Sequence, residues 1–156
     1  VAAAYHDLGL CEERERHHIV SGQIIRADER LRQWFSEEQI EIIACAAEDH
    51  RASAKHEPRS IYGRIVAEAD RIIDPEVTLR RTVQYGLNNY PQFDIEEQYA
   101  RFCAHLQEKY AEGGYLHLWI PESKNGARLA ELRRMIADRE LLRQTFDRLL
   151  TEELNR

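Results

Sequence analysis

The sequence has few of the residues that interrupt or cross-link a chain. Among its 156 residues are four prolines, seven glycines and three cysteines. Because proline and glycine are scarce and strand-like alternation is nearly absent, helical periodicity dominates the pattern. The cysteines, Cys11, Cys45 and Cys103, are odd in number and far apart. This excludes a framework of paired disulfides, fits a reducing cytoplasmic compartment, and argues against zinc held by thiolates.

Positive charge and long apolar runs are also lacking. Lysine and arginine total 22 against 28 aspartates and glutamates, for a formal charge of −6. Such a chain is not built to bind a nucleic-acid polymer, which requires clustered positive charge along a phosphate backbone. The sequence shows neither a signal peptide nor an apolar run long enough to span a membrane. A small anionic substrate remains compatible where local cations offset the charge.

The residues that are present predict one compact all-α domain over 1–156. Hydrophobic residues make up 43% of the chain and charged residues 32%, as in soluble globular proteins. Ser36 with Gln39, and Asp94 with Glu97, have the spacing of capping boxes. We expect Gly9 to end the first helix in the left-handed conformation. The expected helices cover 1–8, 17–27, 36–50, 60–73, 75–87, 94–112, 125–137 and 138–154, with a loop at 51–60 and a short extended piece at 115–120.

Histidines and aspartates lie on apolar faces of four of these helices. His50 continues the apolar face formed by Ile43, Ala46 and Ala47. Other histidines and aspartates lie in the same way, at helical spacing from the apolar residues of their own helices. A single such residue is ordinarily a satisfied core histidine or a cap, because structural networks also bury ionisable groups. Here there are five such residues, all imidazoles or carboxylates, which are the side chains that bind divalent cations. A bound cation would remove the free-energy cost of burying all five together. The sequence therefore predicts a metal site formed by His6, Asp7, His18, His50 and Asp70.

These residues resemble the pattern of the HD superfamily of metal-dependent phosphohydrolases. His6-Asp7 in AAAYHDLGL resembles the central His-Asp pair, and Asp70 in IVAEADRI resembles the last aspartate. HHIVSG resembles a segment that carries a further histidine and points to His18, while AAEDHRAS points to His50. The resemblance covers residues 1 to about 75. The family's first histidine would lie upstream of Val1, and because VAAAY looks like the end of a helix, we expect the natural protein to continue upstream.

The resemblance implies an all-α bundle whose residues 1–75 form the metal-site core, with 76–156 as a helical extension packed on it. It also implies hydrolysis of a phosphoester of a small molecule, often a nucleotide, with one or two divalent ions and Asp7 as the bridge. The donor types do not distinguish Fe, Mn, Mg, Ni and Zn. Arg59, in a loop that also carries Arg51, Lys55 and His56, is the candidate for binding substrate phosphate.

Two other functions remain open on the same residues. Some members of the superfamily hold two irons and act as oxygenases, and a non-catalytic nucleotide-sensing module would keep an incomplete site. The charged amphipathic helices of residues 128–156 could also bury against a second subunit, and nothing in the sequence decides for or against a homodimer.

Overall fold

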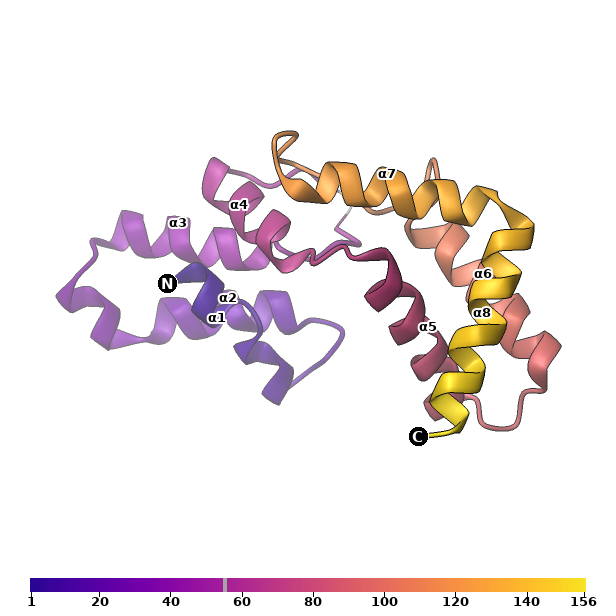
Figure 1. Ribbon diagram of the computed structural model, residues 1–156. Coiled ribbons are helices and arrows are strands. Elements are labelled where there is room, and N and C mark those ends of the chain that lie inside the picture. The colour runs from indigo at the N-terminus through magenta and orange to yellow at the C-terminus, as the bar shows by residue number, and fades with distance from the viewer. Residues whose placement is uncertain (55) are drawn as a thin grey trace. The chain divides into compact units, whose positions relative to one another are not determined.

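The computed structural model describes residues 1–54 and 56–156, and in this part of the chain the protein is all-α, without a β-strand (Figure 1). The chain forms two compact units. The N-terminal unit comprises Val1–Arg71 together with His117–Ser123, and the C-terminal unit comprises Ile72–Leu116 together with Lys124–Arg156. None of the described helices has the length and hydrophobicity needed to cross a membrane.

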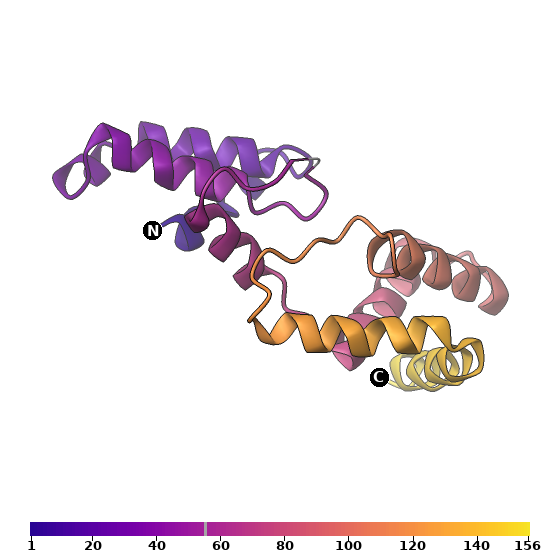
Figure 2. The same ribbon diagram turned by 90° about the horizontal axis from the view of Figure 1, so that it is seen from above.

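The N-terminal unit is built on two helices that lie side by side, α2 and α3 (Figure 2). The capping box predicted at Ser36 is confirmed: the Ser36 hydroxyl accepts from Gln39 N–H, and the Gln39 side chain accepts from Ser36 N–H. The core between these helices is aliphatic, formed by Ile25, Leu31, Ile40, Ala44 and Ala47. The elements of the unit are α1 Ala2–Tyr5, the 3-10 helix η1 Leu8–Cys11, α2 His17–Ala27, η2 Glu29–Gln33, α3 Glu37–Glu48 and α4 Ile61–Asp70.

Gly9 does not have the conformation that the sequence predicted. Among the described residues the only glycine with positive φ is Gly113, so Gly9 is not a left-handed terminator. It is buried where η1 crosses α2, and a Cβ atom there would lie 2.1 Å from the His17 carbonyl oxygen. Its N–H donates to the Ser21 hydroxyl at 2.9 Å. Glycine is needed at this position for close packing, which brings the chain after α1 against the start of α2.

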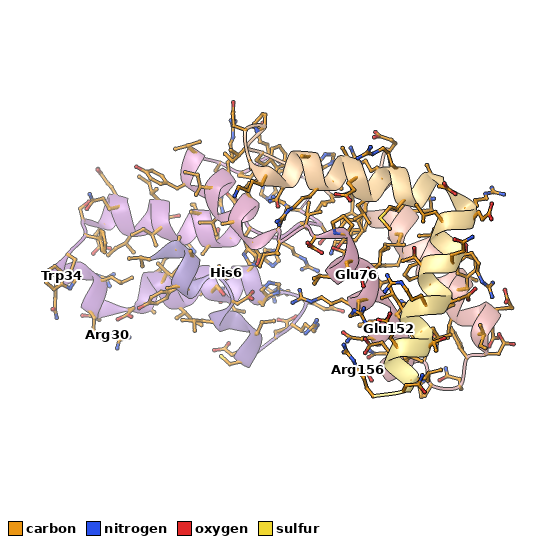
Figure 3. All side chains as sticks on the ribbon, viewed as in Figure 1. His6, Arg30, Trp34, Glu76, Glu152 and Arg156 are labelled. Carbon is orange, nitrogen blue, oxygen red and sulfur yellow. The ribbon has the colours of Figure 1, made fainter. Side chains whose placement is uncertain are left out.

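The C-terminal unit contains the four remaining helices, α5 Pro75–Asn89, α6 Ile95–Lys109, α7 Lys124–Ala137 and α8 Arg139–Leu154. Its core includes Leu79, Phe102 and Phe146, all buried, and the two phenylalanine rings pack with centroids 5.1 Å apart. The Asp94 capping box is confirmed, and Gly113, with φ of 81°, lies in the turn that follows α6. On its surface Arg80 bonds to Glu76 and Glu152, two residues that Figure 3 labels.

Candidate metal centre

Five ionisable residues from the ends of four helical elements of the N-terminal unit meet in one place. His6 and Asp7 directly follow α1, and Figure 3 labels His6 in this region. His17 is the first residue of α2, and Asp70 is the last residue of α4. His50 lies two residues after the end of α3. We call these residues, His6, Asp7, His17, His50 and Asp70, the His–Asp cluster.

The Asp7 carboxylate lies at the middle of the cluster, with its two oxygens facing different partners. Oδ2 is 3.5 Å from His6 Nε2, which in turn is 3.3 Å from Asp70 Oδ1. Oδ1 is 3.4 Å from His17 Nε2 and 3.6 Å from His50 Nε2. Asp7 therefore joins a group on one side, with His6 and Asp70, to a group on the other, with His17 and His50. Ligand atoms of His6, Asp7 and His50 all lie within 4.8 Å of one another.

The backbone fixes which nitrogen of each histidine faces the cluster. His6 Nδ1 lies 2.8 Å from the Ala3 carbonyl oxygen, His17 Nδ1 2.7 Å from that of Arg14, and His50 Nδ1 2.5 Å from that of Ala47. A carbonyl oxygen only accepts, so each Nδ1 carries the hydrogen and donates it. In the neutral imidazole this leaves the Nε2 lone pair facing the cluster, as in histidines that bind a metal ion.

When the imidazoles of His17 and His50 are both neutral, their Nε2 lone pairs face each other with no hydrogen between them. His17 Nε2 and His50 Nε2 are 3.0 Å apart, with ring centroids 5.0 Å apart. Such an approach is stable only when a proton or a cation lies between or beside the two nitrogens. Burial lowers the pKa of His50, which is 3% exposed, and so works against the proton. The residues therefore fit a divalent cation: three imidazole nitrogens and two carboxylates, with no thiolate.

The cluster is open to solvent on its carboxylate side. The side chains of His6 and His17 are 22% and 15% exposed, whereas those of Asp7 and Asp70 are 49% and 42% exposed. The sequence predicted that all five residues are buried. The side chain of His50 is buried, whereas the carboxylates of Asp7 and Asp70 are exposed. Solvent access at Asp7 and Asp70 gives a small ligand a route to the cluster.

Among the predicted metal ligands, His18 is the one that the structure does not bring into the cluster. His17 takes the place assigned to His18, because the two sides of α2 have different neighbours. Ser21, four residues after His17, bonds to Gly9 N–H in the turn after the His6-Asp7 pair. Gly22, four residues after His18, faces α3, where a Cβ would lie 2.2 Å from Glu48 Oε1. The sequence alone does not show which of the two adjacent histidines faces Asp7. The contact between Gly9 and Ser21 places His17, and not His18, on that side of α2.

His18 lines a separate cavity of about 350 Å³ in the N-terminal unit. Its Nδ1 atom is buried and has no hydrogen-bond partner among the described residues. Burial above all, and then the nearby charge of Arg51, lower the pKa of His18 to about 4. The imidazole is therefore neutral near pH 7. The other residues that line the cavity are Ile19, Glu48, His56, Glu57 and Arg59.

Arg59 is occupied by internal partners. Its Nε and backbone N–H donate to the two oxygens of Asp49, at 2.9 Å and 2.7 Å, and the Asp49 side chain has no exposed surface. Its Nη2 donates to Glu48 at 2.7 Å and to the Cys45 carbonyl at 3.1 Å. No contact between Arg59 and the His–Asp cluster is found in the described structure. The residue fastens the 51–60 loop to α3, and this explains its place better than the predicted contact with phosphate.

The rest of the predicted positive loop does not gather at the cluster either. Arg51 donates to the Glu15 carbonyl and to the Ser53 hydroxyl. His56 is exposed, with its Nδ1 3.1 Å from the Glu57 carbonyl oxygen. Lys55, also part of the predicted patch, lies outside the described residues.

The comparisons with known proteins agree with the family suggested by the sequence. A family model described as the HD domain matches residues 1–73. Searches of curated proteins and of solved structures found no significant match. The match includes every residue of the His–Asp cluster, whose donor set suits the divalent cations that HD domains bind. Residues 1–73 of this chain thus match the HD domain, whose superfamily consists typically of metal-dependent hydrolases.

Proposed function

We propose that this HD domain hydrolyses a phosphoester of a small molecule, with a nucleotide as the leading substrate class. The observation that carries the proposal is the position of Asp7 between two groups of donors. His6 and Asp70 with one Asp7 oxygen would hold one divalent cation, and His17 and His50 with the other oxygen would hold a second. Divalent cations held in this way supply Lewis acidity toward a phosphoryl oxygen and lower the pKa of water.

The charges of the cluster favour an anionic substrate in the state with two ions. Asp7 and Asp70 are the only acidic members, and the three imidazoles are neutral when they act as ligands. One dication cancels the two carboxylates, whereas two dications leave an excess of two positive charges. Such a site attracts the multiply charged phosphate of a nucleotide. The exposed side of Asp7 and Asp70 admits it, while the buried ring of His50 fixes the opposite side of the cluster.

The test is phosphate release by the full chain loaded with a defined metal. We would measure the bound metal by elemental analysis and then assay nucleoside mono-, di- and triphosphates with Mn²⁺, Mg²⁺, Co²⁺, Ni²⁺, Zn²⁺ and Fe²⁺. Phosphate release that a chelator abolishes, and that falls at least about 100-fold in Asp7→Asn, would support the proposal. Asp49→Asn is a matched control, because Asp49 is an aspartate of the same unit bonded to Arg59 rather than to the cluster.

The same experiment separates the two alternatives. Oxygen consumption by the iron-loaded protein, without phosphate release, would replace hydrolysis by an oxygenase reaction. Thermal stabilisation by nucleotides without turnover under any metal would indicate a sensing module. Wild-type protein that binds no divalent metal would overturn the proposal altogether.

A further inference from the structure

A segment far from the HD match in sequence is part of the N-terminal unit. Residues 117–123 belong to this unit, although the chain on either side of them belongs to the C-terminal unit. They lie beyond the residues 1–73 that the family model matches. In both views the segment just before α7 passes beside α4 (Figures 1 and 2). We call residues 117–123 the strap.

The strap is held by one buried carboxylate on the last turn of α4. Glu68 is 5% exposed. Its Oε2 accepts from Trp119 N–H at 2.9 Å and from Ile120 N–H at 3.4 Å, and its Oε1 accepts from the Ser123 hydroxyl. Hydrogen bonds to an ionised carboxylate are stronger than those between neutral groups, and a buried carboxylate is costly without them. Glu68 therefore joins α4 firmly to the strap.

Arg71 adds the compensating charge at the same end of α4. It is 7% exposed, and burial lowers the pKa of its guanidinium, while the carboxylates of Glu68 and Asp70 act in the opposite direction. Its Nε and Nη1 have no hydrogen-bond partner in the described part of the chain. Arg71 thus places positive charge near the carboxylates of Glu68 and Asp70, and Glu68 makes the directed bonds to the strap.

Glu68 lies on the same last turn of α4 as Asp70, a member of the His–Asp cluster. Asp70 is the last residue of α4, and Arg71 leaves the helical region, with ψ of 77°. Terminal turns of helices fray readily unless other contacts hold them. Asp70 Oδ1 lies 3.3 Å from His6 Nε2, and the two side chains must stay close to each other to share a cation. A residue two positions earlier, fixed by three donors of the strap, limits the movement of this last turn.

We propose that Glu68 is a positioning residue for the metal centre, and that the strap, by bonding to Glu68, helps to hold Asp70 in place. Glu68 is not a member of the His–Asp cluster, and the bonds described above join it to the strap, so its proposed action on the cluster is through the backbone that carries Asp70. The inference rests on the proposed function insofar as Asp70 is taken as a metal ligand. It goes beyond the HD match, because the three donors to Glu68 lie outside residues 1–73.

The experiment measures Mn²⁺ affinity in the full chain at a temperature well below the melting temperature of each variant. Glu68→Gln keeps the shape of the side chain but removes one acceptor oxygen and the charge. We expect its Kd for Mn²⁺ to rise about tenfold, in the range found when groups that orient metal ligands are removed. The matched control is Glu97→Gln, since the Glu97 carboxylate also accepts a backbone N–H, from Asp94 at 2.9 Å, but belongs to α6. The control is expected to change the Kd less than twofold.

A double-mutant cycle with Asp70→Asn distinguishes positioning from general destabilisation. If Glu68 acts through Asp70, adding Glu68→Gln to Asp70→Asn has no further effect on Mn²⁺ affinity. Equal effects of Glu68→Gln in both backgrounds would overturn the proposal, as would an unchanged Kd in Glu68→Gln. If that variant fails to fold, Ser123→Ala provides the same test with a smaller rise in Kd, and no rise would overturn it. Wild-type protein that binds no Mn²⁺ would instead refute the proposed function.

Discussion

Replacing each of the two adjacent histidines of α2 in turn gives the most decisive test of the metal centre. His17→Ala removes an Nε2 atom that lies 3.4 Å from Asp7 Oδ1 and 3.0 Å from His50 Nε2. His18→Ala removes a ring whose Nδ1 has no partner in the described structure and which lines a different cavity. The two variants delete the same chemical group one position apart. A difference between them therefore reports the geometry rather than the loss of an imidazole.

The expected size of the effect follows from the contacts. On one side of Asp7, His6 and Asp70 are untouched by His17→Ala, so one ion should still bind. On the other side only His50 and the shared carboxylate remain, and the second ion loses one of three protein donors. We expect the affinity for that ion to fall at least about 100-fold, which corresponds to ~2.7 kcal/mol. His18→Ala should leave both affinities within about threefold of the wild type.

The assay is a Mn²⁺ titration of chelator-treated protein, with bound metal counted by elemental analysis. His17→Ala should reduce the stoichiometry from two ions to one at micromolar free metal, with parallel loss of phosphate release. Similar circular dichroism spectra of the two variants would exclude unfolding as the cause. If His18→Ala loses as much metal as His17→Ala, or if His17→Ala binds as the wild type does, the derived cluster is wrong.

Three further outcomes are expected from neighbouring contacts. Gly9→Ala should lower the free energy of unfolding by roughly 1–3 kcal/mol, measured by urea denaturation, because the new methyl group would meet the His17 carbonyl; an unchanged midpoint would contradict the close approach. Arg59→Gln should cost about 2 kcal/mol by leaving the buried Asp49 short of a partner, yet leave the KM for substrate unchanged; a raised KM would restore its predicted contact with phosphate. The pKa of His18 is about 4 when folded and 6.5 when free, so the unfolded chain binds the proton more readily and stability falls as pH drops from 6.5 toward 4. Stability curves of the metal-free His18→Asn variant should be flatter than those of the wild type over that window, and equal slopes would refute the assignment.

Much of the fold followed from local sequence signals. The capping boxes at Ser36 and Asp94, and the scarcity of proline and glycine, placed most helices within a few residues of their observed bounds. These signals act over three or four residues and need no tertiary information. The first helix was the exception: α1 ends at Tyr5, because the chain must turn at His6 and Asp7 before η1 packs on α2.

The candidate site was harder to predict, because it depends on which helix faces meet. Local spacing indicated that His6, Asp7, His50 and Asp70 belong together, and the structure brings these four into contact. It could not distinguish His17 from His18, since the choice depends on Gly9 crossing α2 beside Ser21, a contact 12 residues apart in the chain. The same holds for Arg59, whose side chain bonds to the buried carboxylate of Asp49, ten residues earlier in the chain.

The donors of the strap show most clearly what local pattern leaves out. Glu68 reads in the sequence as one more charged residue of an amphipathic helix, and the strap overlaps the stretch 115–120 that the sequence predicted to be a short extended piece. Only the return of the chain to the N-terminal unit makes the first a buried anchor and the second its partner. Since the last turn of α4 carries Asp70, a change at Ser123, 55 residues from Glu68 along the chain, should alter metal affinity without touching a metal donor. A site assembled from helix ends depends in this way on whatever holds those ends, and the holding residues need not lie within the part of the chain that a family pattern describes.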